Sequence, residues 1–108
     1  MTVLLDHNIP HVLRSHFPGE CEVYTAQYLG WENYADDRLL KVAVEHDFSV
    51  LVTLDTNLKH QQSLDQWAIG VIVFDVHPAT PPHFIHKMDE VRSVLLDVAE
   101  NETLFECS

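Results

Sequence analysis

Aspartates follow three separate apolar runs of the chain, and their placement suggests chemistry on phosphates. Asp6 follows residues 3–5, Asp55 follows residues 50–54, and Asp75 follows residues 71–74. Carboxylates that gather with amide oxygens form the all-oxygen environment that Mg²⁺ or Mn²⁺ prefers. One or two such ions can activate water and stabilise the leaving oxygen of a phosphodiester. The pattern therefore predicts a divalent-metal site, provided that the fold brings these side chains together.

Asp36 and Asp37 open a later helix-like segment and would project over the same rim as Asp6 and Asp55. A structural interpretation competes with the functional one for each residue. Aspartate after a strand is a common turn and capping residue, and an acid in a first helical turn complements the helix dipole. Taken singly, each favours the structural role, whereas Asp6 and Asp55 together indicate a site. Asp75, on the outermost predicted strand, stays open between the two.

The elements that would position these acids alternate between strands and helices. Continuous apolar or β-branched runs are typical of strands buried on both faces of a parallel sheet. They lie at residues 3–5, 22–24, 50–53 and 71–74. Helices are predicted at 10–17, with Asn8 as a possible N-cap, at 36–46 and at 58–67. The clearest helix has its apolar residues three and four apart: Phe84, Met88, Val91, Leu95 and Val98.

Alternating strands and helices predict right-handed crossovers in one α/β domain spanning residues 1–108. We expect a four-stranded parallel sheet in which the strand at 3–5 lies between those at 22–24 and 50–53, with 71–74 outermost. The helices after the first and third strands would then leave on opposite faces. Ligands bind at such a switch point, at the carboxyl ends of the strands, where Asp6 and Asp55 would meet.

Composition limits the possible functions. The net charge of −11 stays negative even if all eight histidines are protonated, and it argues against nucleic-acid binding, which usually needs a basic surface. Bound divalent cations, a basic partner or a local basic face would offset this. Cys21 and Cys107 lie far apart in the sequence, which is not the spacing of a disulfide framework or a zinc site. No segment resembles a signal peptide or reaches the ~20 apolar residues of a membrane span, so a cytoplasmic protein is expected.

Other residues suggest weaker alternatives. His7 with His11, and His83 with His86, have helical spacing, but zinc needs a third converging ligand, so surface histidines are the preferred interpretation. The aromatic group around Gly30 is interpreted as a packed loop in preference to a base-stacking platform; its members are Tyr28, Trp31 and Tyr34. Four bases near the acids in the sequence could meet phosphates or be ordinary solvated residues: Arg14, Arg38, Lys41 and Lys59.

Three segments carry a resemblance to a known family. LLDHNIPHVLR, LGWENYADDRLLKVA and VLVTLDTNL follow each other over roughly the first three quarters of the chain. In order and spacing they resemble the small bacterial PIN-like proteins, relatives of the ribonucleases of toxin–antitoxin operons. The resemblance implies a three-layer α/β/α PIN-like fold and metal-dependent endoribonuclease chemistry.

The same resemblance implies roles for individual residues. Asp6, Asp36 and Asp55 would be the catalytic, metal-binding acids. Supporting residues would be Asn8, Thr53, Asn57 and Asp37, and weak nucleic-acid contacts would come from Arg14, Arg38 and Lys59. The sequence departs from the family pattern at His7, where an acid is common, and at Asn57, where an aspartate is frequent. Both departures remove negative charge from the site.

Two functions are therefore expected as alternatives. In the first, the domain cuts single-stranded RNA with Mg²⁺ or Mn²⁺, as the toxin of a toxin–antitoxin pair. In the second, it is a weak or inactive PIN-like module that binds a small antitoxin-like partner protein or a second copy of itself. A homodimer suits both alternatives, because the predicted sheet has open edges that need cover.

Overall fold

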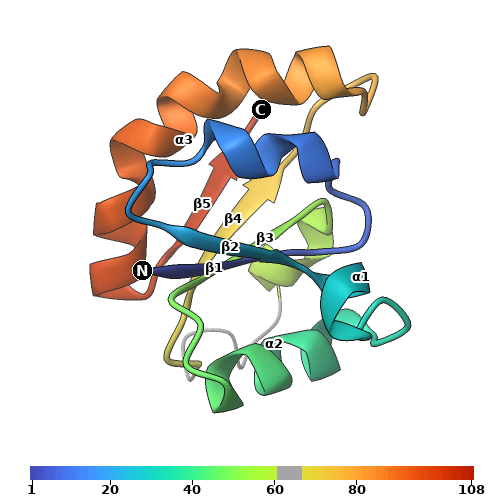
Figure 1. The fold of residues 1–108 in the computed structure, drawn as a ribbon, viewed down its shortest axis with the longest axis vertical. Coiled ribbons are helices and arrows are strands. Elements are labelled where there is room, and N and C mark those ends of the chain that lie inside the picture. The colour runs from blue at the N-terminus through green and yellow to red at the C-terminus, as the bar shows by residue number, and fades with distance from the viewer. Residues whose placement is uncertain (61–66) are drawn as a thin grey trace.

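A single parallel sheet of five strands organises the molecule (Figure 1), in the order β2-β1-β3-β4-β5. The computed structural model describes residues 1–60 and 67–108. The strands are β1 (Thr2–Leu5), β2 (Glu22–Thr25), β3 (Val50–Thr53), β4 (Gly70–Phe74) and β5 (Leu104–Cys107). The α/β class and the predicted order of the first four strands are confirmed.

Helical segments cover both faces of this sheet. The 3₁₀ helix η1 (His11–His16) and the long helix α3 (Pro81–Asn101) pack on one face. On the other face lie α1 (Ala26–Leu29), α2 (Asp36–Glu45) and the 3₁₀ helix η2 (Thr56–His60). The sheet therefore forms the middle layer of three.

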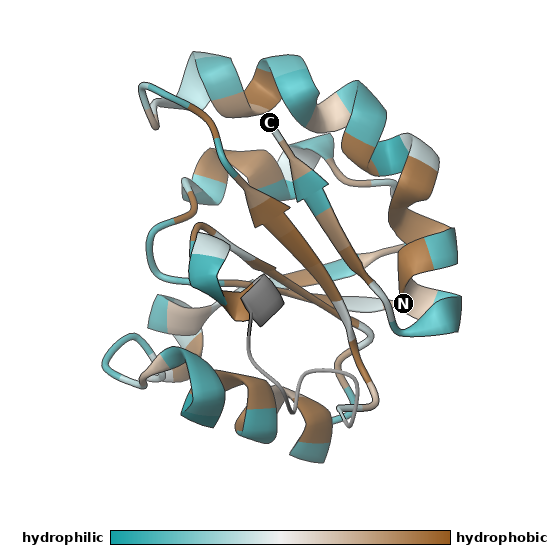
Figure 2. Ribbon diagram, turned by 180° about the vertical axis from the view of Figure 1, so that it is seen from behind, coloured by the Kyte–Doolittle hydropathy of each residue, from teal (hydrophilic) through white to brown (hydrophobic). Residues whose placement is uncertain are grey.

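Two hydrophobic cores follow from the alternation of side chains along the strands. Val3 and Leu5 of β1 face η1 and α3, whereas Leu4 faces α1 and α2. β4 is buried along its whole length, and most of it is drawn in hydrophobic colours in Figure 2. Such runs are continuous because both faces of the strand are covered.

The segments after β1 and β3 leave the sheet on opposite faces. Leu13 of η1 lies in the core shared with α3, and Leu58 of η2 lies in the core shared with α2. Because β1 and β3 are neighbours, this is the predicted switch point. A crevice forms there at the carboxyl ends of the two strands.

The prediction of four strands was wrong, because β5 continues the sheet beside β4. The sequence of β5, LFEC, contains a glutamate among its apolar residues. Because β5 is an edge strand, only Cys107 is fully buried. The criterion of a continuous apolar run therefore could not detect it.

The helix α3 packs closely against the start of β4. A Cβ at Gly70 would lie 2.5 Å from the Val98 carbonyl oxygen.

The helix predictions were right for the long elements and less so for the short ones. α2 and α3 are confirmed, and all five periodic residues of α3 are buried. Residues 11–16 form a 3₁₀ helix instead of an α-helix, and Pro10, not Asn8, occupies its N-cap position. The helix predicted at 58–67 is replaced by η2 as far as residue 60, residues 61–66 lie outside the described residues, and Trp67 is not helical.

The one-turn helix α1 was not predicted. Thr25 at the end of β2 caps it, since its Oγ1 accepts a hydrogen bond from the Tyr28 amide at 3.1 Å. Gly30 ends it with φ of 76°, a left-handed conformation that glycine adopts without steric cost. α1 thus turns the chain sharply beside the carboxyl end of β1.

Candidate active site

Pairing between β1 and β3 brings the first acid to a threonine of the neighbouring strand. Leu5 is in register with Val52, and the Asp6 amide continues the ladder by donating to the Val52 carbonyl at 2.9 Å. The next residue of β3 is Thr53, whose Oγ1 donates to Asp6 Oδ2 at 2.8 Å. Residues 47 apart in the chain are therefore held side by side by strand register.

Asp6 is a buried carboxylate, with only 3% of its surface exposed. Burial of a charge is costly unless hydrogen bonds compensate for it. Besides the Thr53 hydroxyl, the backbone amide of His7 donates to Asp6 Oδ1 at 2.7 Å. The His7 ring Nδ1 also lies 3.0 Å from Oδ1. These contacts hold the carboxylate in one orientation at the end of β1.

Asp55 is tied to the same threonine through its backbone. Its amide donates to Thr53 Oγ1 at 3.2 Å, and its Oδ1 accepts from the Asn57 amide at 2.9 Å. The Thr53 hydroxyl thus accepts from one acid's backbone and donates to the other's side chain. Asp55 Oδ2 has no such backbone partner among the described residues, and the side chain is half-buried.

Asp36, the first residue of α2, completes the group. Its pKa is raised from 3.8 to about 7, chiefly because it shares a side-chain hydrogen bond with Asp55. Partial burial, the negative charges of Asp55 and Asp6, and a hydrogen bond with Asp6 add to the shift. Two carboxyl groups can share a hydrogen bond only if one carries a proton. Asp36 therefore lies within reach of both Asp55 and Asp6, and the Thr53 hydroxyl links those two residues to each other.

The donor chemistry of this cluster suits a hard divalent cation, since carboxylate oxygens come together from three elements. Within residues 1–60 and 67–108, however, no group of three or more His, Cys, Asp or Glu side chains is already arranged as a metal site. The raised pKa of Asp36 means that this carboxyl group holds a proton below about pH 7. A cation would have to replace that proton.

Two further predicted acids lie outside the cluster. Asp75 follows β4, but its carboxylate pairs with His77 Nε2 at 2.8 Å and does not contribute to the shift of Asp36. Asp37 is exposed on α2, and its Oδ1 accepts from the Arg38 amide at 2.8 Å. Both acids make the local contacts of turn and helix-start residues.

The remaining predicted residues are distributed around the site. Thr53 contacts two of the acids and Asn57 contacts Asp55 through its backbone, whereas Asn8 is exposed in the loop after β1. Arg38 lies over the ring of Tyr34, 4.3 Å from its centroid. The side chain of Lys59 lies outside what the structure describes.

Two contacts around the site were not predicted. Gln27 of α1 donates through Nε2 to the His7 carbonyl at 2.8 Å, which fixes the loop that carries Asp6. Arg14 Nε donates to the Val23 carbonyl at 3.1 Å, so this base lies against β2. Neither contact has a sequence signal, because each depends on a helix whose placement is set by tertiary packing.

We expect Thr53→Val to lower the free energy of unfolding by about 1–3 kcal/mol, because the shape is kept while the buried Asp6 carboxylate loses a donor and the Asp55 amide loses an acceptor. Urea unfolding near neutral pH measures this. The control is Thr2→Val, the same change in β1, where the structure records no side-chain hydrogen bond in the described part of the chain; it should stay within about 0.5 kcal/mol of wild type. Equal effects of the two changes would contradict a special role for the Thr53 hydroxyl.

Comparison of the chain with protein-family models, with curated proteins and with solved structures found no match. Among the helices described by the structure, none has the length and apolar character needed to cross a bilayer.

Proposed function

We propose that this domain is a metal-dependent endoribonuclease of PIN-like type that uses Mg²⁺ or Mn²⁺ at Asp6, Asp36 and Asp55. The observation that carries the proposal is that the Thr53 hydroxyl bonds both the Asp6 carboxylate and the Asp55 amide. Asp36 at the start of α2 lies close enough to these two acids for both to raise its pKa. Acids that perturb each other so strongly are common at functional sites. Without a ligand such a cluster costs stability, which a purely structural role does not explain.

Different residues orient the acids and hold a proton at the site. The Thr53 hydroxyl and the His7 amide orient Asp6. The Asn57 amide holds one oxygen of Asp55, while Asp36 holds a proton that can leave near neutral pH. A cation bound by these acids would supply an activated water and would stabilise the departing oxygen of a phosphodiester. His7, at the mouth of the site with 43% of its side chain exposed, lies where a proton could pass to solvent.

Isothermal titration calorimetry with Mn²⁺ tests the site directly. We expect wild type to bind, with release of a proton around pH 6 because Asp36 is mostly protonated there. Asp55→Asn should weaken binding by roughly 10-fold or more, and Asp75→Asn should leave it unchanged. Titrations in two buffers of different ionisation enthalpy measure the proton. Binding that Asp55→Asn leaves intact would contradict the proposal.

Two features of the sequence favour a second candidate function. The net charge of −11 and the replacement of acids by His7 and Asn57 suit a weak or inactive PIN-like module that binds a partner. That partner would be a small antitoxin-like protein or a second copy of the chain, seated on the open edges of β2 or β5. Absence of Mn²⁺ binding in the calorimetric test would favour this alternative. We propose a cytoplasmic, bacterial toxin–antitoxin setting for either case.

A further inference from the structure

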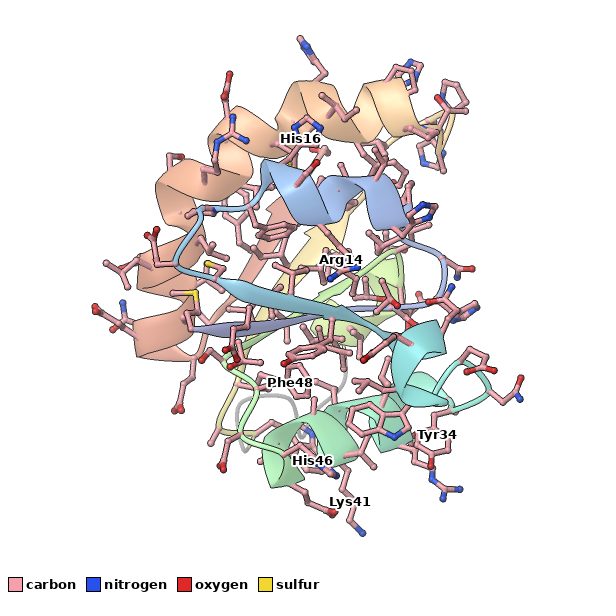
Figure 3. All side chains as sticks on the ribbon, viewed as in Figure 1. Arg14, His16, Tyr34, Lys41, His46 and Phe48 are labelled. Carbon is pink, nitrogen blue, oxygen red and sulfur yellow. The ribbon has the colours of Figure 1, made fainter. Side chains whose placement is uncertain are left out.

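Arg14 is a base that the fold holds in place beside the proposed active site. Its side chain reaches from η1 to β2, where Nε donates to the Val23 carbonyl at 3.1 Å. Figure 3 shows it between η1 and β2. Only Nε is used in this bond, so the two terminal nitrogens of the guanidinium stay available, with no partner recorded in the described part of the chain. An arginine fixed in this way loses little further freedom when it binds an oxyanion.

The guanidinium lines a small hollow at the open edge of β2. This hollow has a volume of about 170 Å³ and is completed by Tyr24, Thr25 and Tyr28. The two tyrosine rings are stacked, with centroids 6.3 Å apart. Tyr28 is 78% exposed, which is unusual for a large ring and leaves one face free. A cation next to an exposed aromatic face is the combination that binds the phosphate and base of an unpaired nucleotide.

The hollow extends toward the loop that follows Asp6. Thr25 lines it and also lines a second hollow, of about 440 Å³, together with His7 and Asn8. Val23 is in register with Val3 of β1, three residues before Asp6. At about 3.3 Å per residue, Arg14 is therefore anchored roughly 10 Å from the level of Asp6 along the strand. A short single strand can bridge that distance.

The other arginines are less available to a substrate. Arg92 is bound to Asp89 and to the His16 carbonyl, and Arg38 lies over Tyr34. In a chain with a net charge of −11, phosphate binding needs a local cation, and Arg14 supplies one next to the acids.

We propose that Arg14 and Tyr28 form a subsite for one nucleotide of a single-stranded RNA that extends from the carboxylates along the β2 edge. The Arg14 terminal nitrogens donate to its phosphate, and the exposed face of Tyr28 stacks on its base. This inference rests on the proposed function and adds the path of the substrate. Because stacking needs an unpaired base, the subsite selects single strands over duplexes.

Fluorescence anisotropy with a labelled short oligouridylate, in a Ca²⁺ buffer and again in EDTA, tests the subsite. We expect Arg14→Gln and Tyr28→Ala each to weaken binding about 10-fold. Only Arg14→Gln should also reduce the slope of log affinity against log salt by about 1, because only it removes a phosphate contact. A blunt RNA duplex of the same length should bind at least about 10-fold more weakly than the single strand.

Lys41→Gln is the matched control, because it removes the same charge from a side chain that projects from α2 away from the sheet (Figure 3). It should change affinity less than about 2-fold. Equal effects of Arg14→Gln and Lys41→Gln, or no binding of the oligouridylate by wild type, would overturn the subsite. If Tyr28→Ala binds the oligouridylate like wild type while Arg14→Gln binds it more weakly, the stacking role of Tyr28 is wrong. The Mn²⁺ titration decides the carboxylate site independently of all these outcomes.

Discussion

Asp6→Asn should reduce RNA cleavage in the presence of Mn²⁺ by roughly 100-fold or more, which is the largest effect that we expect on activity. Asp6 is the most buried of the three acids, so its negative charge is the least screened by water. The substitution removes that charge while keeping the shape of the side chain. An asparagine can still accept from the His7 amide and donate from Nδ2 to the Thr53 hydroxyl, so the fold should be retained.

Asp75→Asn is the control for this cleavage experiment. Asp75 also follows a strand of the same sheet, but its carboxylate pairs with His77 and not with the cluster. A panel of single-stranded RNAs should therefore be cut by Asp75→Asn at the wild-type rate. If wild type, Asp6→Asn and Asp75→Asn all cut equally poorly, the domain is not a nuclease of this kind.

Asp36→Asn should stabilise the fold at alkaline pH and leave it nearly unchanged in acid. The pKa of Asp36 is about 7 in the folded protein and 3.8 without its neighbours, so between these values the folded state binds more protons than the unfolded state. The contribution of the Asp36 carboxyl group to the free energy of unfolding is therefore fully present below about pH 4 and is lost as the pH rises through about 7. After allowance for the partial exposure of Asp36, the substitution should gain on the order of 1–2 kcal/mol at about pH 8.

Urea unfolding at about pH 5 and about pH 8 in EDTA measures this difference, and Asp37→Asn is the matched control. Asp37 is the next residue of the same helical turn, but it is exposed and its carboxylate accepts only from the Arg38 amide in the described part of the chain. Its substitution should have the same small effect at both pH values. A gain in stability from Asp36→Asn that does not depend on pH would contradict the shared proton.

The sequence could predict much of the fold because the buried elements have strong periodic patterns. The first four strands read as apolar, β-branched or aromatic runs, and the spacing in α3 identified the five side chains that it buries. β5 and α1 escaped prediction for opposite reasons. β5 is a half-exposed edge strand with a polar residue, and α1 is a single turn made by a threonine cap and a glycine, with too few residues to show a period.

For the site, strand order was enough to place Asp6 near Asp55, because both follow neighbouring parallel strands. The helix pattern alone could not decide between Asp36 and Asp37, since each opens α2 and each suits a helix start; the family resemblance selected Asp36. Only the packing of α2 against the sheet directs Asp36 to the other acids and leaves Asp37 in solvent. The anchoring of Arg14 to β2 was equally beyond prediction, because it depends on how η1 lies over the edge strand.

A crystal structure of the protein grown with Mn²⁺ tests the central claim most directly, through anomalous scattering from the ion. We predict a peak bounded by the carboxylates of Asp6, Asp36 and Asp55, with the hydrogen bond between Asp36 and Asp55 replaced by oxygen–metal contacts. An Asp36–Asp55 contact that persists with no peak beside it, or an ion found only at the Asp75–His77 pair, would contradict the account.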